Sequence, residues 1–362
     1  MNEMRPKPRV SPDRGPLPHR PQLSRVFHRS SAPWLSAAPW AETPSVGNLA
    51  LLRSSDLDER GMTPRRIRAE LASGALVRLR PGVYASGSKW KASTPGQQVI
   101  ARARALALIS TTPPLFSHET AAALQGLPLY KPDRSRVHVI APIGRPGRAT
   151  GVIRHRGDVP ADELEEIDGM LCTGLERTAA DCARTQSFEA SVTIADAALR
   201  RVAFTGAASY DLAAAERFRA AALTIAQRSA HGQTRAQRTL RFADGRAQLP
   251  GESLSRVRLH ELGFREIRLQ VRVPGPGGRN FYVDFGIEEA QAFGEFDGAM
   301  KYVDGRLTDG RTASQVVDDE KQREDWIRGT TQRRLVRWGW PHIADAEGLG
   351  RRLTAFGIDP PA

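Results

Sequence analysis

The hydrophobic and polar positions near the C-terminus predict a helix, three strands, a second helix and a fourth strand. These elements are expected at residues 251–262, 268–273, 280–285, 293–297, 313–328 and 334–338. In the first helix, Glu252 recurs with Ser255, Leu259 and Leu262 at spacings of three and four, so we expect it to face the sheet. The alternative is a first-turn Glu that only complements the helix dipole.

Two of these strands place carboxylates at alternating positions. In the run Phe281-Tyr282-Val283-Asp284-Phe285 we expect the apolar residues to share one face, so that Asp284 points to the other. In Phe293-Gly294-Glu295-Phe296-Asp297 the same period of two puts both carboxylates on one face. The pattern predicts that side chains from two strands could bind one cation.

The pattern near the N-terminus is typical of short helices followed by a hairpin. Leu49, Leu51 and Leu52 predict a first helix, and Thr63-Pro64 begins another that Gly74 ends. Residues 76–80 and 83–85 form the expected hairpin, with Pro81-Gly82 between its strands. Helix, turn, helix and hairpin is the order of a winged helix-turn-helix.

The middle of the chain predicts a mixed unit. Its expected elements are a helix from Ser117 to Gln125, strands at 137–140 and 151–155, a helix with a Thr173/Glu176 capping box, and helices at 190–201 and 206–230. Residues 231–249 are basic and turn-rich, which predicts a connector.

Length and composition agree with an α/β multidomain protein. At 362 residues the chain exceeds one ordinary core, and no apolar run is long enough for a membrane span. The expected organisation is a disordered, basic, Pro-rich leader (1–45), a winged helix-turn-helix (46–95), a middle α/β domain (96–209), a helix and basic connector (210–249) and a C-terminal restriction-endonuclease-like α/β domain (250–362). The leader could equally reflect a start site assigned too early.

The formal charge of +13 is uneven along the chain. Basic residues exceed acidic ones in 1–95 and 210–249, whereas 96–209 and 250–362 are close to neutral. We therefore expect attraction to phosphate mainly from the N-terminal part, with an Arg-rich composition bias as the alternative. Cys172 and Cys182 are expected to be buried thiols in a reducing compartment, and the start of the chain lacks a secretory signal, so cytoplasm is the expected location.

Carboxylates on neighbouring strands indicate a magnesium site. Mg²⁺ prefers carboxylate oxygens and activates water for phosphodiester hydrolysis. We expect Asp284 and Glu295 to hold the ion, Asp297 or Glu252 to complete or orient its shell, and Lys301 or Lys321 to stabilise the developing charge. Mn²⁺ is an alternative cofactor, and solvated carboxylates on an amphipathic hairpin are the alternative interpretation.

Arginines on the predicted winged helix indicate a DNA surface. Arg65, Arg66 and Arg68 lie on its second helix, and Arg78 and Arg80 lie on the wing. Such residues could contact phosphates while one Arg reads guanine in the major groove. The alternative is a basic, solvated helix of a small interaction domain.

Other motifs in the chain do not point to a specific chemistry. His118-Glu119 does not continue into a zinc-protease motif, because Ala122 stands where the second histidine would fall. His138 and His155 are expected to be structural histidines on strands. The glycine-rich turns 144–148 and 275–279 lack the Lys-Ser/Thr of a P-loop.

Residues 251–345 resemble the very-short-patch-repair-like branch of the PD-(D/E)XK nuclease fold. The matching motifs are Gly251-Glu252, Val283-Asp284-Phe285, Gly294-Glu295-Phe296-Asp297-Gly298 and Val336-Arg337-Trp338. The resemblance implies that Asp284 and Glu295 bind Mg²⁺, helped by Glu252 from the first helix. Many relatives have Lys two residues after the Glu, where this chain has Asp297, and Lys301 could supply the missing cation.

Residues 46–201 resemble the AbiEi-type abortive-infection antitoxin. The matching motifs are Arg66-Ile67, Val77-Arg78-Leu79-Arg80-Pro81-Gly82-Val83-Tyr84, Ser117-His118-Glu119-Thr120-Ala121-Ala122 and Leu127-Pro128-Leu129. That family pairs a promoter-binding winged helix with a second α/β domain. The resemblance implies double-stranded DNA as a partner, and it leaves a toxin protein partner and a homodimer as further expectations.

Together these patterns predict a DNA-binding protein with a Mg²⁺-dependent endonuclease domain, acting in phage defence or repair. The alternative is a non-catalytic AbiEi-like antitoxin or transcriptional regulator with a degenerate nuclease fold. A third interpretation is a toxin-neutralising partner with no DNA role, whose binding would be insensitive to salt.

Overall fold

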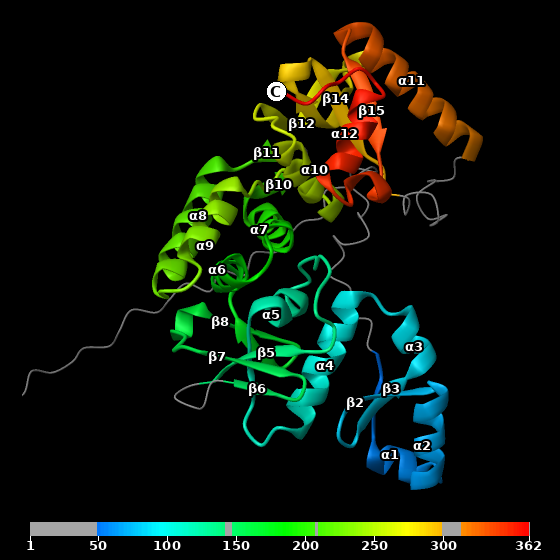
Figure 1. Ribbon diagram of the computed structural model, residues 1–362, viewed down its shortest axis with the longest axis vertical. Helices are drawn as coiled ribbons and strands as arrows, with labels where there is room; N and C mark the ends of the chain where they lie inside the picture. Colours follow the sequence, from blue (N-terminus) through cyan, green and yellow to red (C-terminus); the bar gives the residue numbers. More distant parts are fainter. Residues whose placement is uncertain (1–48, 142–146, 207–208, 299–312, 362) are drawn as a thin grey trace, which may run out of the picture. The chain divides into compact units, whose positions relative to one another are not determined.

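The computed structural model describes residues 49–141, 147–206, 209–298 and 313–361 (Figure 1). The expected leader and Lys301 lie outside these ranges. The described residues form four β-sheets, and each sheet draws its strands from one continuous stretch of sequence. The mixed α/β class expected from the sequence is therefore observed. No helix in this described part combines the length and apolar character that crossing a membrane requires.

The first sheet has three strands in the order β1-β3-β2. The elements here are β1 (Leu51–Arg53), α1 (Ser54–Glu59), α2 (Pro64–Ser73), β2 (Leu76–Arg80), β3 (Val83–Ser86) and α3 (Gly87–Ala92). Helix α2 begins and ends as predicted: the Thr63 side chain accepts a hydrogen bond from the Arg66 backbone N–H, and Gly74 closes the helix with φ of 76°.

The predicted helix around Leu51 is wrong, because residues 51–53 form strand β1. Leu51 and Leu52 pair with Ala85 and Tyr84 of β3 in an antiparallel ladder. Leu51 packs beside the cluster that contains Leu49. A three-residue segment gains more from this ladder and its packing than from helix propensity, which is a weak preference.

The second sheet has six strands in the order β6-β7-β5-β4-β9-β8. Its strands and the helices around it are α4 (Pro95–Ile109), β4 (Leu115–Phe116), α5 (His118–Leu124), β5 (Val137–Ala141), β6 (Gly147–Ala149), β7 (Val152–Arg156), β8 (Leu164–Ile167) and β9 (Met170–Thr173). Strands β5 and β7 are parallel neighbours, with Ile140 opposite His155. Helix α5 packs against β5.

Four helices and a small hairpin follow. They are α6 (Leu175–Thr185), α7 (Phe188–Ala203), β10 (Phe204–Gly206), β11 (Ser209–Tyr210), α8 (Leu212–Gln227) and α9 (Gln233–Phe242). The Thr173/Glu176 capping box is wrong: Gly174 is the N-cap, and the Thr173 hydroxyl pairs with the Thr178 hydroxyl at 2.7 Å.

Helix α9 lies where we predicted a connector without regular structure. Ala236, Thr239 and Leu240 are buried on one side of α9, while Arg235 and Arg238 are exposed. The helical period of the buried positions decides the structure here, and the basic composition reflects only the solvent side.

The last sheet has four strands in the order β12-β13-β14-β15, with β14 and β15 parallel. The elements are α10 (Pro250–Glu261), β12 (Ile267–Pro274), β13 (Asn280–Ile287), β14 (Ala292–Phe296), α11 (Ala313–Thr331), β15 (Arg334–Trp338) and α12 (Ala346–Thr354). This order of elements matches the one predicted from the sequence.

The β12–β13 hairpin does not keep one apolar face, in contrast to our expectation for Val283 and Phe285. Val283 belongs to a cluster that contains Ile327 of α11, whereas Phe285 belongs to one that contains Leu254 of α10. The ladder skips the pair Gln270 and Asp284, and Gln270 has a φ of 50°. At this irregularity the apolar side chains of the two strands change from one face of the sheet to the other. Strict alternation along the strand therefore does not predict the direction of the Asp284 side chain.

Helix α10 is buried along residues 251–259 and is tied to α7 by an ion pair. Arg256 lies 2.8 Å from the Asp196 carboxylate, and both side chains are almost fully buried. Asp196 also accepts a hydrogen bond from the Asp244 backbone N–H at 2.7 Å. Burial raises the pKa of Asp196 to about 6 although Arg256 opposes the shift, so the carboxylate is ionised at neutral pH.

We expect Asp196→Ala to lower the free energy of unfolding by about 3–5 kcal/mol, because it leaves Arg256 buried without its counter-charge. Urea denaturation at neutral pH measures the change. Asp325→Ala, at an exposed position of α11, is the control and should stay within about 0.5 kcal/mol of the parent protein. Equal stability of both variants would contradict the role of this pair.

Candidate functional site

Helix α10 approaches the C-terminal sheet closely at its first turn, which carries Glu252. A Cβ added at Gly251 would lie 2.1 Å from the Phe296 ring, so only glycine allows this approach. Glu252 is 3% exposed, as the helical spacing predicted. Its Oε2 accepts a hydrogen bond from the Gln248 backbone N–H at 2.8 Å. The helix thus buries a carboxylate against the sheet.

Gln270 brings Glu252 and Asp284 together. Its Nε2 lies 3.3 Å from Glu252 Oε2 and 3.3 Å from Asp284 Oδ1. The second Asp284 oxygen accepts a hydrogen bond from the Phe296 backbone N–H at 2.9 Å. Two carboxylates and one amide therefore converge from α10, β12 and β13.

Glu295 is instead held by arginines. Arg323 of α11 lies 2.6 Å from Glu295 Oε1, and Arg337 of β15 lies 3.1 Å from Glu295 Oε2. Arg323 and Arg337 also bind Glu320. These carboxylates keep the pKa of both guanidinium groups above the ordinary value in spite of burial. The result is a mixed-charge network in which Glu295 is already neutralised.

The predicted metal ligands are therefore only partly assembled. Within the described residues, Glu252, Asp284 and Glu295 do not form a set whose ligand atoms lie mutually within 4.8 Å. Asp297 follows directly after β14, is half-buried, and donates its backbone N–H to the Trp338 carbonyl. Lys321 is exposed on α11.

The predicted DNA-contacting arginines divide into two groups. Arg65, Arg66, Arg68 and Arg78 are exposed. Arg80 is buried, and it donates hydrogen bonds to the Thr150 and Gly151 carbonyls at 2.7 and 2.8 Å. We therefore correct the expectation for Arg80: its guanidinium binds backbone of this chain and is not presented to phosphate.

Three histidines lie together: His138 and His155, which we expected to be structural, and His118, whose zinc-protease motif we rejected. His118 from α5, His138 from β5 and His155 from β7 each offer a ring nitrogen, and these nitrogens lie within 4.8 Å of one another. His138 Nδ1 is 2.9 Å from His155 Nε2, and the His118 and His155 rings stack with centroids 3.6 Å apart. Among the described residues this is the group of three whose geometry suits a metal ion.

Burial controls the protonation of this group. Burial lowers the pKa of His138 and of His155 to about 4, and it also lowers the pKa of His118 well below its ordinary value. Burial raises the pKa of the neighbouring Glu119 to about 7. The thiols Cys172 and Cys182 are free and buried as expected, and burial raises the pKa of both.

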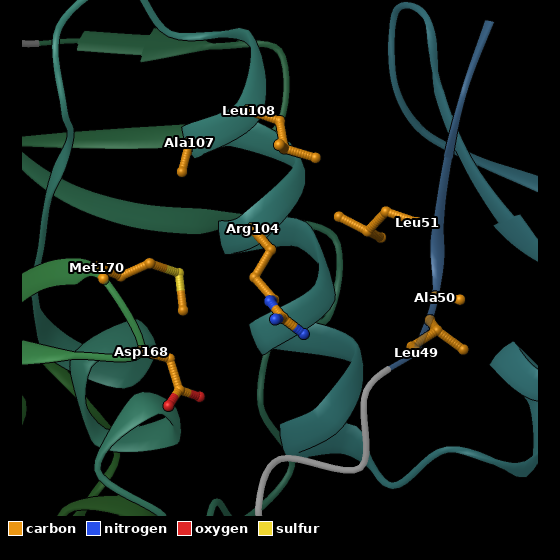
Figure 2. Close-up of a pocket in the computed structure, with 9 residues that line it drawn as sticks. Leu49, Ala50, Leu51, Arg104, Ala107, Leu108, Asp168 and Met170 are labelled. Atoms are coloured by element: carbon orange, nitrogen blue, oxygen red, sulfur yellow. The ribbon is translucent and has the colours of Figure 1, made fainter. Parts of the chain in front are cut away.

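A pocket of about 510 Å³ opens between residues 49–51, helix α4 and the turn that joins β8 to β9 (Figure 2). Leu49, Leu51, Leu108 and Met170 give it a mostly apolar lining. Arg104 and Asp168 are its charged side chains. None of the residues predicted to act in catalysis or DNA binding lines this pocket.

Comparisons with known proteins give relatives without a described activity. The uncharacterized proteins MT2308 and Rv2248, from two strains of Mycobacterium tuberculosis, are each 29% identical over 236 residues, covering 65% of this chain and 79% of each relative. No family model matches the chain. The crystal structure of the RV2827C protein from Mycobacterium tuberculosis aligns with 53% of this chain and 76% of its own, at 17% identity and a TM-score of 0.31.

Sequence reasoning missed Gln270 and the joint role of the histidines. Gln270 occupies one of several polar positions in β12, and nothing distinguishes it from Arg268 or Arg272 until the fold is known. The histidines are separated by 17 or more residues, so no short motif contains them.

The histidine pKa values predict a pH dependence of stability. Between about pH 4 and pH 6.5 the unfolded chain binds protons that His138 and His155 in the folded chain do not, so stability falls as pH falls through this range. The raised pKa values of Glu119 and Asp196 act in the opposite sense, so the histidine contribution is read from the difference between the parent protein and a histidine variant. From about pH 7 to pH 5 we expect a loss on the order of 1–2 kcal/mol per histidine.

Urea denaturation at about pH 7 and at about pH 5 measures this loss of stability. A chelator in every buffer keeps metal ions away from the histidines, so that only protonation changes their charge. His155→Gln should reduce the loss, whereas His231→Gln, at an exposed position, should leave it unchanged. An equal loss in His155→Gln and the parent protein would contradict the prediction.

Proposed function

We propose that this protein binds double-stranded DNA and that its C-terminal part hydrolyses phosphodiesters with Mg²⁺. The observation that carries the proposal is the convergence of Glu252 and Asp284 on the Gln270 amide. The resemblance of residues 251–345 to the PD-(D/E)XK nuclease fold supports the same site. The helix, strand, strand, strand, helix, strand order is compatible with it.

The side chains at this site suit a hard cation. Carboxylate and amide oxygens are ligands that Mg²⁺ accepts, and the ion keeps several of its own waters. If the Gln270 amide turned over, its oxygen would join Glu252 and Asp284 as a third oxygen ligand. When bound there, Mg²⁺ would supply Lewis-acid activation of water and of the scissile phosphate.

The protein's own groups have separate roles in this proposal. Asp284 is oriented by the Phe296 backbone N–H, and Glu252 is oriented by the Gln248 backbone N–H. Arg323 and Arg337 neutralise Glu295. Either guanidinium could shift from Glu295 to the developing negative charge on phosphate, which is the role we expected of Lys301 or Lys321.

We also propose that residues 51–86 act as a winged helix-turn-helix. The order strand, helix, helix, hairpin and the sheet order β1-β3-β2 support this interpretation. Arg65 and Arg68, three residues apart on α2, share a helix face. With Arg66 and Arg78 they form what we name the arginine surface: Arg65, Arg66, Arg68 and Arg78.

Asp284→Asn should reduce Mg²⁺-dependent cleavage by at least about 100-fold, because it removes a negative ligand and keeps an oxygen for the Phe296 N–H. Purified protein is incubated with supercoiled, nicked or mismatched DNA in Mg²⁺, Mn²⁺ or chelator, and products are quantified on gels. DNA affinity is measured in chelator and should be unchanged.

Asp325→Asn, at an exposed position of α11, is the matched control and should retain cleavage. Cleavage that survives chelator would contradict the magnesium mechanism. Equal loss of cleavage and DNA binding in Asp284→Asn would contradict the assigned role of Asp284.

A second function, a non-catalytic DNA-binding regulator, is favoured by the contacts of Glu295. Two arginines form ion pairs with Glu295, which is the carboxylate that the nuclease resemblance assigns to the metal. Asp297 stands where many relatives have Lys. On this alternative the parent protein binds DNA through the arginine surface and leaves every DNA substrate intact in Mg²⁺ and in Mn²⁺.

Replacing all four residues of the arginine surface by Gln should weaken DNA binding and reduce its salt dependence. Each lost phosphate contact should lower the slope of log affinity against log salt by about 0.9. Fluorescence anisotropy over a series of salt concentrations measures the slope. Arg235→Gln, an exposed arginine on α9, is the control, and a slope that is the same in both variants would contradict the proposed surface.

A further inference from the structure

We propose that His118, His138 and His155 form a binding site for one divalent transition-metal ion of the zinc class, separate from the magnesium site proposed above. The three side chains come from α5, β5 and β7, and their ligand nitrogens lie within 4.8 Å of one another. Imidazole nitrogen is a ligand of Zn²⁺ and its neighbours in the first transition row, whereas Mg²⁺ selects oxygen. The chemistry of the three ligands therefore points to a different metal from that of Glu252 and Asp284.

Metal binding would require the three rings to rotate, because their planes are stacked at 13–27° to one another, while their ligand nitrogens already lie within 4.8 Å. Zn²⁺ with bonds of about 2.0–2.1 Å in a tetrahedral shell separates its ligand nitrogens by roughly 3.3 Å. His138 Nδ1 and His155 Nε2 are already 2.9 Å apart. An ion between the rings would replace this hydrogen bond, and its fourth position would remain for water.

Polar groups lie beside the second nitrogen of two of the rings. His138 uses Nδ1 toward His155, and its Nε2 lies 3.8 Å from Glu119 Oε2. Ser117 Oγ lies 3.0 Å from His118 Nδ1, so Nε2 is the nitrogen that His118 would give to a metal. Carboxylate or hydroxyl contacts to the second ring nitrogen are typical of histidines that bind metals.

The backbone at His118 adds an independent observation. His118 has a φ of 52°, in the left-handed region that side chains other than glycine rarely adopt. Ser117 is the N-cap of α5, yet its hydroxyl makes no capping hydrogen bond and contacts the His118 ring instead. Backbone strain, and an N-cap side chain that contacts another residue instead of the helix, are both expected where the surrounding structure holds a side chain in a functional position.

The strand arrangement accounts for the other two ligands. β5 and β7 are parallel neighbours, and Ile140 lies opposite His155. Val137 and Val139 pack in the core cluster that includes Ala121 and Ala123 of α5. His138 lies between these valines and is paired with Ile153 of β7, two residues before His155, whose ring nitrogen it approaches to 2.9 Å. A hydrogen-bonded, metal-free stack of rings is the competing explanation, and experiment separates the two.

The test uses the full chain, stripped of metal with a chelator and then titrated with Zn²⁺. We expect about one Zn²⁺ per chain by elemental analysis, with a Kd below roughly 1 µM, as neutral imidazole ligands and an ordered shell allow. Co²⁺ should give the visible absorption of a low-coordinate site. Zn²⁺ should also raise the Tm of the stripped protein.

His155→Gln should weaken Zn²⁺ binding by about 100-fold and abolish the Co²⁺ absorption, and Glu119→Gln should weaken binding by about 10-fold through the orientation of His138. His231→Gln, an exposed histidine, is the matched control and should bind as the parent does. Circular dichroism establishes that each variant is folded.

Two results would overturn the proposal. One is a stripped parent protein that takes up no Zn²⁺ and gives no Co²⁺ absorption, which would leave the hydrogen-bonded stack as the explanation. The other is Zn²⁺ uptake that His155→Gln retains in full. Zn²⁺ uptake and Co²⁺ absorption are measured on the parent protein as well as on its variants, so the first result is decisive even if a variant fails to fold. Neither measurement depends on DNA cleavage.

Discussion

The burial of helix α10 is the constraint on which the candidate magnesium site depends. Residues 251–259 of this helix are buried, which requires glycine where the helix meets the Phe296 ring. The Ser255 hydroxyl accepts a hydrogen bond from the Trp338 indole at 2.8 Å, and Arg256 pairs with Asp196 of α7. A helix held on both sides in this way cannot turn Glu252 to solvent, so its carboxylate stays beside Gln270 and Asp284. Close packing thus keeps a negative side chain where solvation alone would not place it.

Charge is arranged differently around the two groups of carboxylates in the C-terminal sheet. Glu252 and Asp284 share the Gln270 amide and each accept a hydrogen bond from a backbone N–H group. Glu295 lies against two arginines on the side that α11 covers. A metal ion at Glu295 would have to compete with these two guanidinium groups. This difference is why the two functions proposed for the domain depend on different carboxylates.

Local signals in the sequence predicted much of the fold. Thr63-Pro64 and Gly74 bound α2, because a hydroxyl at the N-cap and a left-handed C-cap act within a few residues. Alternating residues located β12 to β15, and helical spacing placed Glu252 on the buried side. One error falls where a distant segment decides, because β3 draws residues 51–53 into a strand. Another is local: Gly174, and not the preceding Thr173, is the N-cap of α6. The basic composition of residues 231–249 concealed the helical period of α9.

The sequence by itself determined the mixed α/β class, most of the element boundaries and the buried position of Glu252, since these depend on periodicity and caps that are read over a few turns. Only the tertiary structure decided which side chains meet. It placed Gln270 between the carboxylates, paired Glu295 with Arg323 and Arg337, and gathered His118, His138 and His155. It also turned Arg80 inward to the Thr150 and Gly151 carbonyls. The reason is physical: contacts between segments far apart in the chain depend on sheet order and on the irregularity at Gln270, and neither leaves a local pattern in the residues themselves.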